Sequence, residues 1–208
     1  MVRASHSLLA AALLATPPMA WAAEPVLVPK QQVVSDFAAC VLEQEPERVR
    51  ALLASEVGSA EESAMAKRLM EGTASCARGR PFITMRTGEA RGALAEAVLK
   101  ADAALAGHAE ALGPQPMDRP TETEGRRFVV AYGRCLAGTA PVQARALIAT
   151  DYDSAQERAA MMAFDGALKD CMPIGFNYQL NIRDVRNHVA TALYDRAIAA
   201  SGGGDKNA

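Results

Sequence analysis

Apolar residues recur every three or four positions through most of the chain, which is the period of a helix that packs on one face. Two stripes, within residues 32–44 and 127–138, have the same spacing of four, three and one positions. Their members are Val33, Phe37, Cys40 and Val41, and Phe128, Tyr132, Cys135 and Leu136. A proline soon follows each stripe, at Pro46 and Pro141, and is expected to start a short second helix.

The two stripes are 95 positions apart, and this shift aligns much of the chain with itself without a gap. It places Cys40 on Cys135 and Cys76 on Cys171, so that the two cysteines of each pair are 36 positions apart. A Ser-Ala-x-Glu sequence in the first part of the chain also recurs in the second. Such matches are harder to obtain by chance than matches of alanine, so the pattern predicts a tandem duplication.

Each copy is expected to contain four helices, which makes the fold class all-α. The third helix has the clearest start, because Ser59 and Ser154 each begin a capping box in which the glutamate three residues later reaches back to the serine N–H. We expect this helix to run to Cys76 in one copy and to Cys171 in the other. The fourth helix is expected at residues 88–106 and 183–200.

The predicted helices divide the chain into a first copy at 32–106, a linker at 107–125, a second copy at 126–200 and a disordered tail at 201–208. The linker is polar and contains several prolines, which should stiffen it and limit coupling between the copies. Residues 176–182 alternate apolar and polar side chains, which is the period of a strand. Together with residues 82–85 they could form a short two-stranded pairing between the copies.

Residues 1–22 have the three parts of a secretory signal peptide. Arg3 supplies the positive start, residues 8–15 are apolar, and Ala20-Trp21-Ala22 forms a small-x-small cleavage site. A membrane anchor is the alternative, but the apolar run is too short to span a bilayer and two prolines follow it. We therefore expect cleavage near Ala22 and a mature protein that is periplasmic or secreted.

Export into an oxidising compartment favours disulfides over other roles for the four cysteines. A thioredoxin-type redox site would need a C-x-x-C sequence, which the chain lacks. A zinc site is disfavoured because the two histidines after residue 22 are not close in sequence to any cysteine. We expect the pairs Cys40–Cys76 and Cys135–Cys171, because each copy then carries its own cross-link between its first and third helices.

Composition narrows the classes of function further. Alanine accounts for 44 of the 208 residues and aromatic residues for only 5%, a mixture that favours helices over a β-sandwich or barrel. The formal net charge is −2 with both signs interspersed, so a nucleic-acid-binding face is not expected. After the signal peptide no apolar run approaches 18 residues, so no membrane span is expected in the mature chain.

The sequence contains none of the common catalytic, phosphate-binding or metal-binding motifs, and we expect no catalytic residue, no metal ligand and no cofactor. Asp151-Tyr152-Asp153 resembles a carboxylate pair, but its position before a helix start favours capping and solvation over an acid–base or metal role. His188 lies beside the apolar stripe of the fourth helix, where a boundary residue is the more common case, and His108 lies in the linker.

Arg50 and Arg145 are related by the 95-residue shift. We expect the stem of each arginine to pack and its head to pair with a nearby carboxylate or with a helix C-terminus. The alternative is that they anchor an acidic partner or ligand.

Two short sequences carry a resemblance to small exported bacterial α-helical proteins with paired cysteines. They are Phe37-Ala-Ala-Cys40, and Arg91-Gly-Ala-Leu-Ala-Glu-Ala97 in the fourth helix. The resemblance covers both copies but implies no particular activity. The chain is also loosely similar to disulfide-bonded periplasmic immunity proteins that neutralise toxins, through Cys171-Met-Pro and a following helix with Val185 and Val189.

These observations favour a non-catalytic helical binding or interaction protein of the periplasm or secreted fraction, whose partner would be another periplasmic protein. A toxin-neutralising immunity protein is the first alternative. The second is an enzyme of unrecognised type, which would need acids such as Asp165 or Asp170 to converge with His188 in one pocket.

Overall fold

The computed structural model describes residues 28–77, 85–121, 125–175 and 181–202. Within these ranges the regular structure is all helical, with ten α-helices and one 3₁₀ turn and without a strand. The signal peptide predicted at residues 1–22, most of the two runs predicted to pair as strands, and most of the tail lie outside the described residues.

The chain order of the helices is simple and their bounds are as follows. They are α1 (Lys30–Gln44), α2 (Pro46–Ala54), α3 (Ala60–Gly72), the 3₁₀ turn η1 (Ala74–Ala77), α4 (Thr87–Ala101), α5 (Ala103–Ala111), α6 (Gly125–Thr139), α7 (Pro141–Ile148), α8 (Ala155–Met162), α9 (Asp165–Cys171) and α10 (Ile182–Ala200). The shift of 95 residues relates the first residue of α1 to that of α6, of α2 to that of α7, of α3 to that of α8 and of α4 to that of α10.

Local sequence signals start several of these helices as expected. Pro46 and Pro141 occupy the first turns of α2 and α7, where a missing N–H group does no harm. The hydroxyl of Ser59 accepts a hydrogen bond from the Glu62 backbone N–H at 3.0 Å, and Ser154 accepts from Glu157 at 2.9 Å. These serines satisfy N–H groups that the first turns of α3 and α8 leave without partners.

The third and fourth predicted helices are interrupted. The third ends at Gly72 in one half and continues as η1 to Ala77, and in the other half it divides into α8 and α9. The fourth helix of the first half ends at Ala101, because Asp102 has extended backbone and its carboxylate accepts from the Leu105 N–H at 3.0 Å. Asp102 therefore starts α5, which occupies the first residues of the predicted linker.

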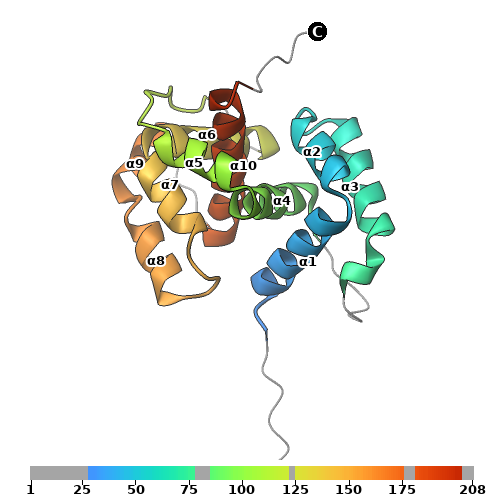
Figure 1. Ribbon diagram of the computed structural model, residues 1–208. Coiled ribbons are helices and arrows are strands. Elements are labelled where there is room, and N and C mark those ends of the chain that lie inside the picture. The colour runs from blue at the N-terminus through green and yellow to red at the C-terminus, as the bar shows by residue number, and fades with distance from the viewer. Residues whose placement is uncertain (1–27, 78–84, 122–124, 176–180, 203–208) are drawn as a thin grey trace, which may run out of the picture.

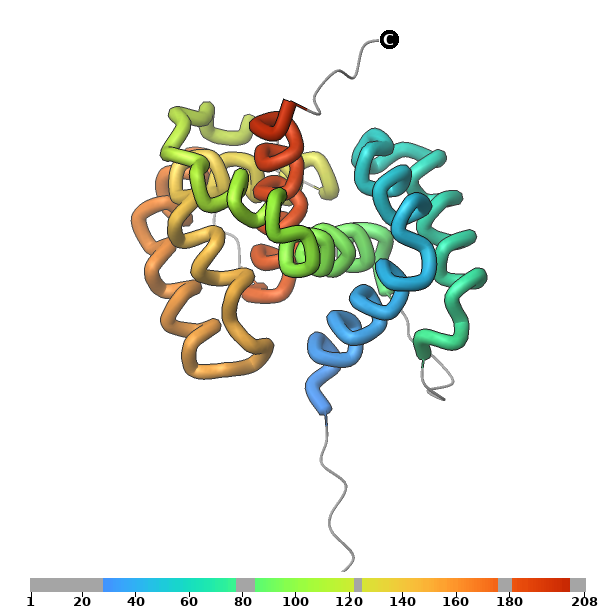
Figure 2. Tube along the Cα trace, in the orientation of Figure 1, coloured from blue at the N-terminus to red at the C-terminus, as the bar shows by residue number. Residues whose placement is uncertain are grey.

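Helices α4 and α10 cross at the centre of the molecule, with α1–α3 on one side and α5–α9 on the other (Figures 1 and 2). Although α5 follows α4 in the chain, it packs on α10 and α7. The remaining described part of the linker also lies on this second side, where the Gln115 N–H donates to the Gly138 carbonyl at 2.8 Å. One apolar cluster contains buried residues of both sides, including Phe37, Leu52, Phe128 and Leu193.

The crossing of α4 and α10 is close because of Gly92. A Cβ atom on Gly92 would lie 2.5 Å from the Cβ of Asn187, the residue 95 positions later. Gly133 makes a similar approach between α6 and α10, where an added Cβ would lie 2.6 Å from the Cβ of His188. The two sides are therefore packed against one another, rather than coupled only weakly through a linker as the sequence suggested.

The four cysteines lie in two pairs at the distance of a disulfide, with Cα atoms 5.6 Å apart for Cys40–Cys76 and 5.7 Å apart for Cys135–Cys171. The first pair joins α1 to η1, and the second joins α6 to the end of α9. Among the described residues, no helix is long and apolar enough to cross a membrane.

Candidate functional site

A buried arginine in the second half of the molecule binds side chains and backbone of several helices. Arg186, on α10, is 1% exposed and forms a two-pronged pair with the Glu96 carboxylate of α4, at 2.9 Å from Nε and 2.7 Å from Nη2. Its Nη1 donates to Glu157 at 2.6 Å. Lys100 also contacts Glu96, at 2.6 Å. One arginine and one lysine thus pair with two glutamates; Arg186 and both glutamates are buried, whereas Lys100 is partly exposed.

The same guanidinium also binds the chain that follows α7. Its Nη2 donates to the Ile148 carbonyl at 3.3 Å and to the Thr150 carbonyl at 2.8 Å, and the ring of Tyr152 lies 3.8 Å from its central carbon. Burial alone would raise the pKa of Glu96, but the hydrogen bonds and charges of Arg186 and Lys100 outweigh burial and lower it. Glu96 therefore remains ionised near neutral pH.

Arg91, on α4, has the corresponding place in the first half. It is 2% exposed, pairs with Glu62 at 3.3 Å, and donates to the Leu52 carbonyl at 2.9 Å and to the Leu53 carbonyl. A second arginine, Arg126 of α6, also binds Glu62, at 2.7 Å. In the first half two arginines bind one carboxylate, whereas in the second half one arginine binds two carboxylates.

The glutamates of the two predicted capping boxes have a different partner from the one expected. Glu62 accepts from the Gly58 N–H at 2.7 Å and Glu157 from the Asp153 N–H at 2.8 Å, so each reaches one residue beyond the serine. Gly58 and Asp153 have positive φ angles of 88° and 57°, which change the direction of the local backbone. Each glutamate thereby closes the turn before a helix and also holds a buried arginine.

A groove of about 1070 Å³ opens where the two sides meet. We call it the junction groove. It is lined by the first turns of α1, α4, α6 and α10 and the residues just before α4 and α10, with Lys30, Arg86, Arg126, Arg183, Glu89 and Asp184 as its acidic and basic lining residues. Val129, which is partly buried, adds apolar surface.

The junction groove has an excess of positive charge, although the chain as a whole carries −2. Lys30 pairs with Glu89 at 3.1 Å and Arg126 with Glu62. Of the other charged lining residues that the structure describes, the exposed Arg86 and Arg183 are basic and Asp184 is acidic. Neither α1 nor α6 has an acidic residue in its first turn to offset the partial positive charge of the helix start. Burial lowers the pKa of His188 to about 4, so this histidine adds no charge at neutral pH.

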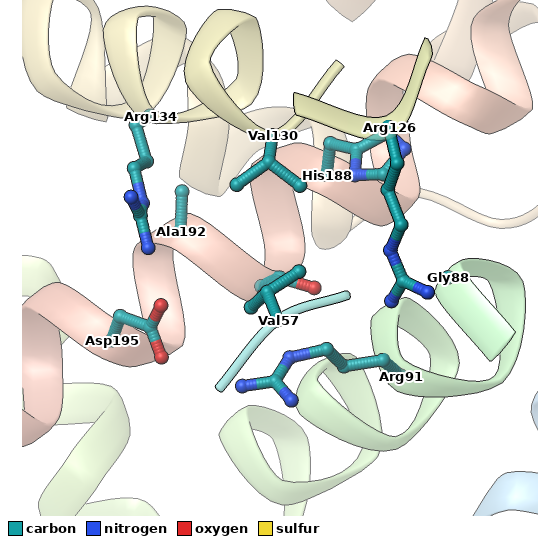
Figure 3. Close-up of a pocket in the computed structure, with 10 residues that line it drawn as sticks. Val57, Gly88, Arg91, Arg126, Val130, Arg134, His188, Ala192 and Asp195 are labelled. Atoms are coloured by element: carbon teal, nitrogen blue, oxygen red, sulfur yellow. The ribbon is translucent and has the colours of Figure 1, made fainter. Parts of the chain in front are cut away.

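A small cavity adjoins the groove and shares Gly88, Arg126 and His188 with it. Its open volume is about 10 Å³. Figure 3 shows Arg126 extending from α6 toward Arg91, with Arg134 and Asp195 on another wall. Thr191 also lines this cavity.

The other residues singled out in the sequence are separated in the structure. His188 is half-buried near the helix crossing, as a boundary residue, whereas Asp165 and Asp170 are exposed and do not line the groove or the small cavity with it. Asp151 and Asp153 are exposed. The described residues contain no group of three or more His, Cys, Asp or Glu side chains that could hold a metal ion.

Arg50 and Arg145 have the kinds of contact expected for packed surface arginines. Arg50 pairs with Glu47 at 2.6 Å, and Arg145 donates to the Ala109 carbonyl at 2.9 Å near the end of α5. His108 is exposed on α5.

Sequence reasoning missed the buried, paired charges of Arg91, Arg186 and Glu96. A signal was present, because the same shift of 95 places Arg91 on Arg186, within helices whose other inward positions are mostly apolar. An arginine that recurs beside an apolar stripe is a candidate for a buried, paired charge. Glu96 has no such signal, because its counterpart is Thr191.

Comparison with family models, with curated proteins and with solved structures found no match to this chain. The resemblance to exported proteins with paired cysteines therefore stays a prediction, and the roles of individual residues rest on their geometry.

Proposed function

We propose that the mature chain is a non-catalytic helical binding protein of the periplasm or secreted fraction, and that the junction groove is its ligand site. The observation that carries this proposal is a groove of about 1070 Å³ with an excess of basic residues. That volume is of the size that holds a ligand or an extended segment of a partner protein. The two cysteine pairs fit an oxidising compartment.

The fold is further proposed to be a tandem duplication of a four-helix unit. The helix starts related by 95 residues support it, and so do Arg91 and Arg186, which bind carbonyls at equivalent positions at the ends of α2 and α7, namely Leu53 and Ile148, and Ser55 and Thr150. The first turns of α1 and α4 are then the counterparts of those of α6 and α10. A groove formed by these four turns lies where the two copies meet.

The ligand is proposed to be an acidic segment of a partner protein. Arg86 and Arg183 are exposed at the groove and would form charge-assisted hydrogen bonds with carboxylates. The starts of α1 and α6, whose first turns contain no acidic residue, favour the same sign of charge. Val129, which is only partly buried, gives such a segment apolar surface to pack on.

Fluorescence anisotropy with a labelled oligoglutamate peptide tests this function. The native chain should bind the peptide, and the double variant Arg86→Glu, Arg183→Glu should raise the Kd by about tenfold, which corresponds to ~1.4 kcal/mol. An oligoglutamine peptide of equal length should not bind, because it lacks the charges.

Arg68→Glu is the matched control, because Arg68 is exposed on α3, away from the groove. It makes the same change in net charge per residue and should leave the Kd unchanged. Equal binding of oligoglutamate by the native chain and the double variant, or no binding by either, would reject the groove as an acidic-ligand site.

Export is tested separately by the intact mass of the protein isolated from a periplasmic fraction. We expect a chain that begins at Ala23 and emits no tryptophan fluorescence, because Trp21 is the only tryptophan in the sequence. A mature protein that retains residues 1–22 contradicts the proposed cleavage.

A further inference from the structure

The two buried arginines, Arg91 and Arg186, each bind a glutamate and the carbonyls at the end of a helix, but they differ at Nε. Nε of Arg186 donates to the Glu96 carboxylate at 2.9 Å. Nε of Arg91 is buried and has no hydrogen-bond partner among the described residues. Buried N–H groups are nearly always paired, so an unpaired one beside a cavity points to a bound species. The difference arises because Thr191 stands at the position that corresponds to Glu96.

A second unpaired donor lies on the same cavity. Nε of Arg126 is also buried without a partner in the described part of the chain, and Arg126 and Arg91 both line the small cavity with Thr191. The Thr191 hydroxyl donates to the Asn187 carbonyl at 3.0 Å, and the side chain brings no charge. The Nε–H groups of two positively charged arginines are thus unpaired beside this cavity. In the other half, the Glu96 carboxylate accepts from the corresponding Nε–H group of Arg186.

The local charge identifies the chemistry of the missing partner. In the second half, Arg186 and Lys100 balance Glu96 and Glu157. Among the described residues, the basic side chains that line the small cavity are Arg91, Arg126 and Arg134, and the acids that line it or pair with these arginines are Asp195 and Glu62, one charge fewer; Asp184 lies on the adjoining groove. His188 is neutral at pH 7, because burial and the charge of Arg126 lower its pKa to about 4 although Asp184 raises it.

We propose that the small cavity binds one monovalent anion the size of chloride, between Arg91 and Arg126, in the place that the Glu96 carboxylate takes in the other half. An open volume of about 10 Å³ leaves room for a single small species, of the size of a water molecule or a monatomic ion. A bound anion makes the charge balance of the two halves equal. It also gives both Nε groups a charged acceptor.

Thermal unfolding in sodium chloride and in sodium gluconate at equal ionic strength tests the proposal. Gluconate is too large for the cavity, so the native chain should unfold at a higher temperature in chloride. At a chloride concentration of ten times its Kd, the difference should be about 3–5 °C. Broadening of the ³⁵Cl NMR signal by the folded protein gives a second readout that does not depend on unfolding.

Two variants each copy a residue from the corresponding position of the other half. Thr191→Glu supplies the carboxylate that Glu96 supplies there, and Arg126→Gln introduces the amide of Gln31. Each removes the excess positive charge, so each should lose the chloride-specific rise in Tm and the ³⁵Cl broadening. Because Arg126 is partly exposed, its variant tests the site even if Thr191→Glu does not fold.

Arg68→Gln, on the outer face of α3, is the control and should keep the full chloride response. The proposal is overturned if the native chain unfolds at the same temperature in both salts and does not broaden the ³⁵Cl signal, which would indicate a neutral water in the cavity. It is also overturned if both exchange variants keep the native response. Neither outcome depends on whether the junction groove binds acidic peptides.

Discussion

At the scale of single residues, the stability of this molecule depends on a few charged side chains that are buried together. Arg186 illustrates the balance of effects. Moving its guanidinium out of water is costly, but two carboxylates, two carbonyls and an aromatic ring surround it. Since these groups are buried as well, removing the arginine leaves Glu96 and Glu157 without their main partner.

Arg186→Met should therefore lower the free energy of unfolding by about 3–5 kcal/mol, because a charge left unpaired in a buried site is expensive. Urea denaturation followed by circular dichroism measures the loss. Arg183→Met, at an exposed position one turn earlier on α10, is the control and should change stability by less than about 0.5 kcal/mol. Similar losses in both variants would show that burial of Arg186 does not matter.

His188 gives the molecule a pH dependence with a definite sign. Burial lowers its pKa in the folded state from 6.5 to about 4, so as the pH falls through this interval the unfolded chain binds a proton that the folded chain does not. Stability should therefore decrease as the pH falls from about 6.5 to 4, by up to about 3 kcal/mol. Denaturation midpoints measured across this interval provide the test.

His188→Gln should flatten the decrease between about pH 6.5 and 5. Glu96 contributes mainly below its ordinary pKa of 4.5, because its pKa is lowered in the folded state. His108→Gln, at an exposed site on α5, should keep the native pH dependence. A native pH profile in His188→Gln would contradict the assignment.

At the scale of elements, the central feature is the crossing of α4 and α10. Glycine is a poor helix former, so Gly92 within α4 costs stability locally. The structure supplies the compensation, because the missing side chain lets the two helices approach at Asn187. Helix propensity therefore favours a residue other than glycine at position 92, whereas the close helix packing requires glycine there.

Gly92→Ala should destabilise the protein by about 1–3 kcal/mol, although alanine is the better helix former, because the added Cβ would overlap Asn187. Gly107→Ala is the matched control, since Gly107 lies in α5 with no heavy atom within 4 Å of an added Cβ. It should stabilise by about 0.5–1 kcal/mol. Thermal unfolding of both variants decides whether the crossing is as close as described, and stabilisation by both would refute it.

At the scale of the whole molecule, one apolar core joins the two sides while each side has its own cysteine pair. Alanine-rich helices bury little apolar area per residue, so cross-links have a large relative effect on stability. The packing of α4 on α10 and of α5 on α7 makes the unfolding of one side expose the core of the other. We therefore expect one cooperative unfolding transition.

Peptide mapping without reduction should recover Cys40 joined to Cys76 and Cys135 joined to Cys171. Removing one cross-link with Cys40→Ser and Cys76→Ser should lower stability by about 3–4 kcal/mol, because each bond closes a loop of 36 positions. Both sides should still unfold in the same transition. A peptide that joins Cys40 to Cys135, or two separate transitions in the variant, would contradict this arrangement.

The sequence by itself determined the features that depend on neighbours within a helix or two. The apolar period of Val33, Phe37 and Val41 was sufficient for a helix, and Pro46 and Ser59 were sufficient for two helix starts, because these effects act over one or two turns. The equal gaps between cysteines also indicated their pairing, since the shift of 95 residues relates one pair to the other.

Tertiary structure alone decided which charges meet. Glu96 and Arg186 are 90 positions apart and come together only because α4 crosses α10, and Arg126 reaches Glu62 from the other side of the molecule. No pattern along the chain encodes these pairs, because a long-range ion pair depends on how whole helices pack. The same packing forms the junction groove and the small cavity from residues that are far apart in sequence, for the same physical reason.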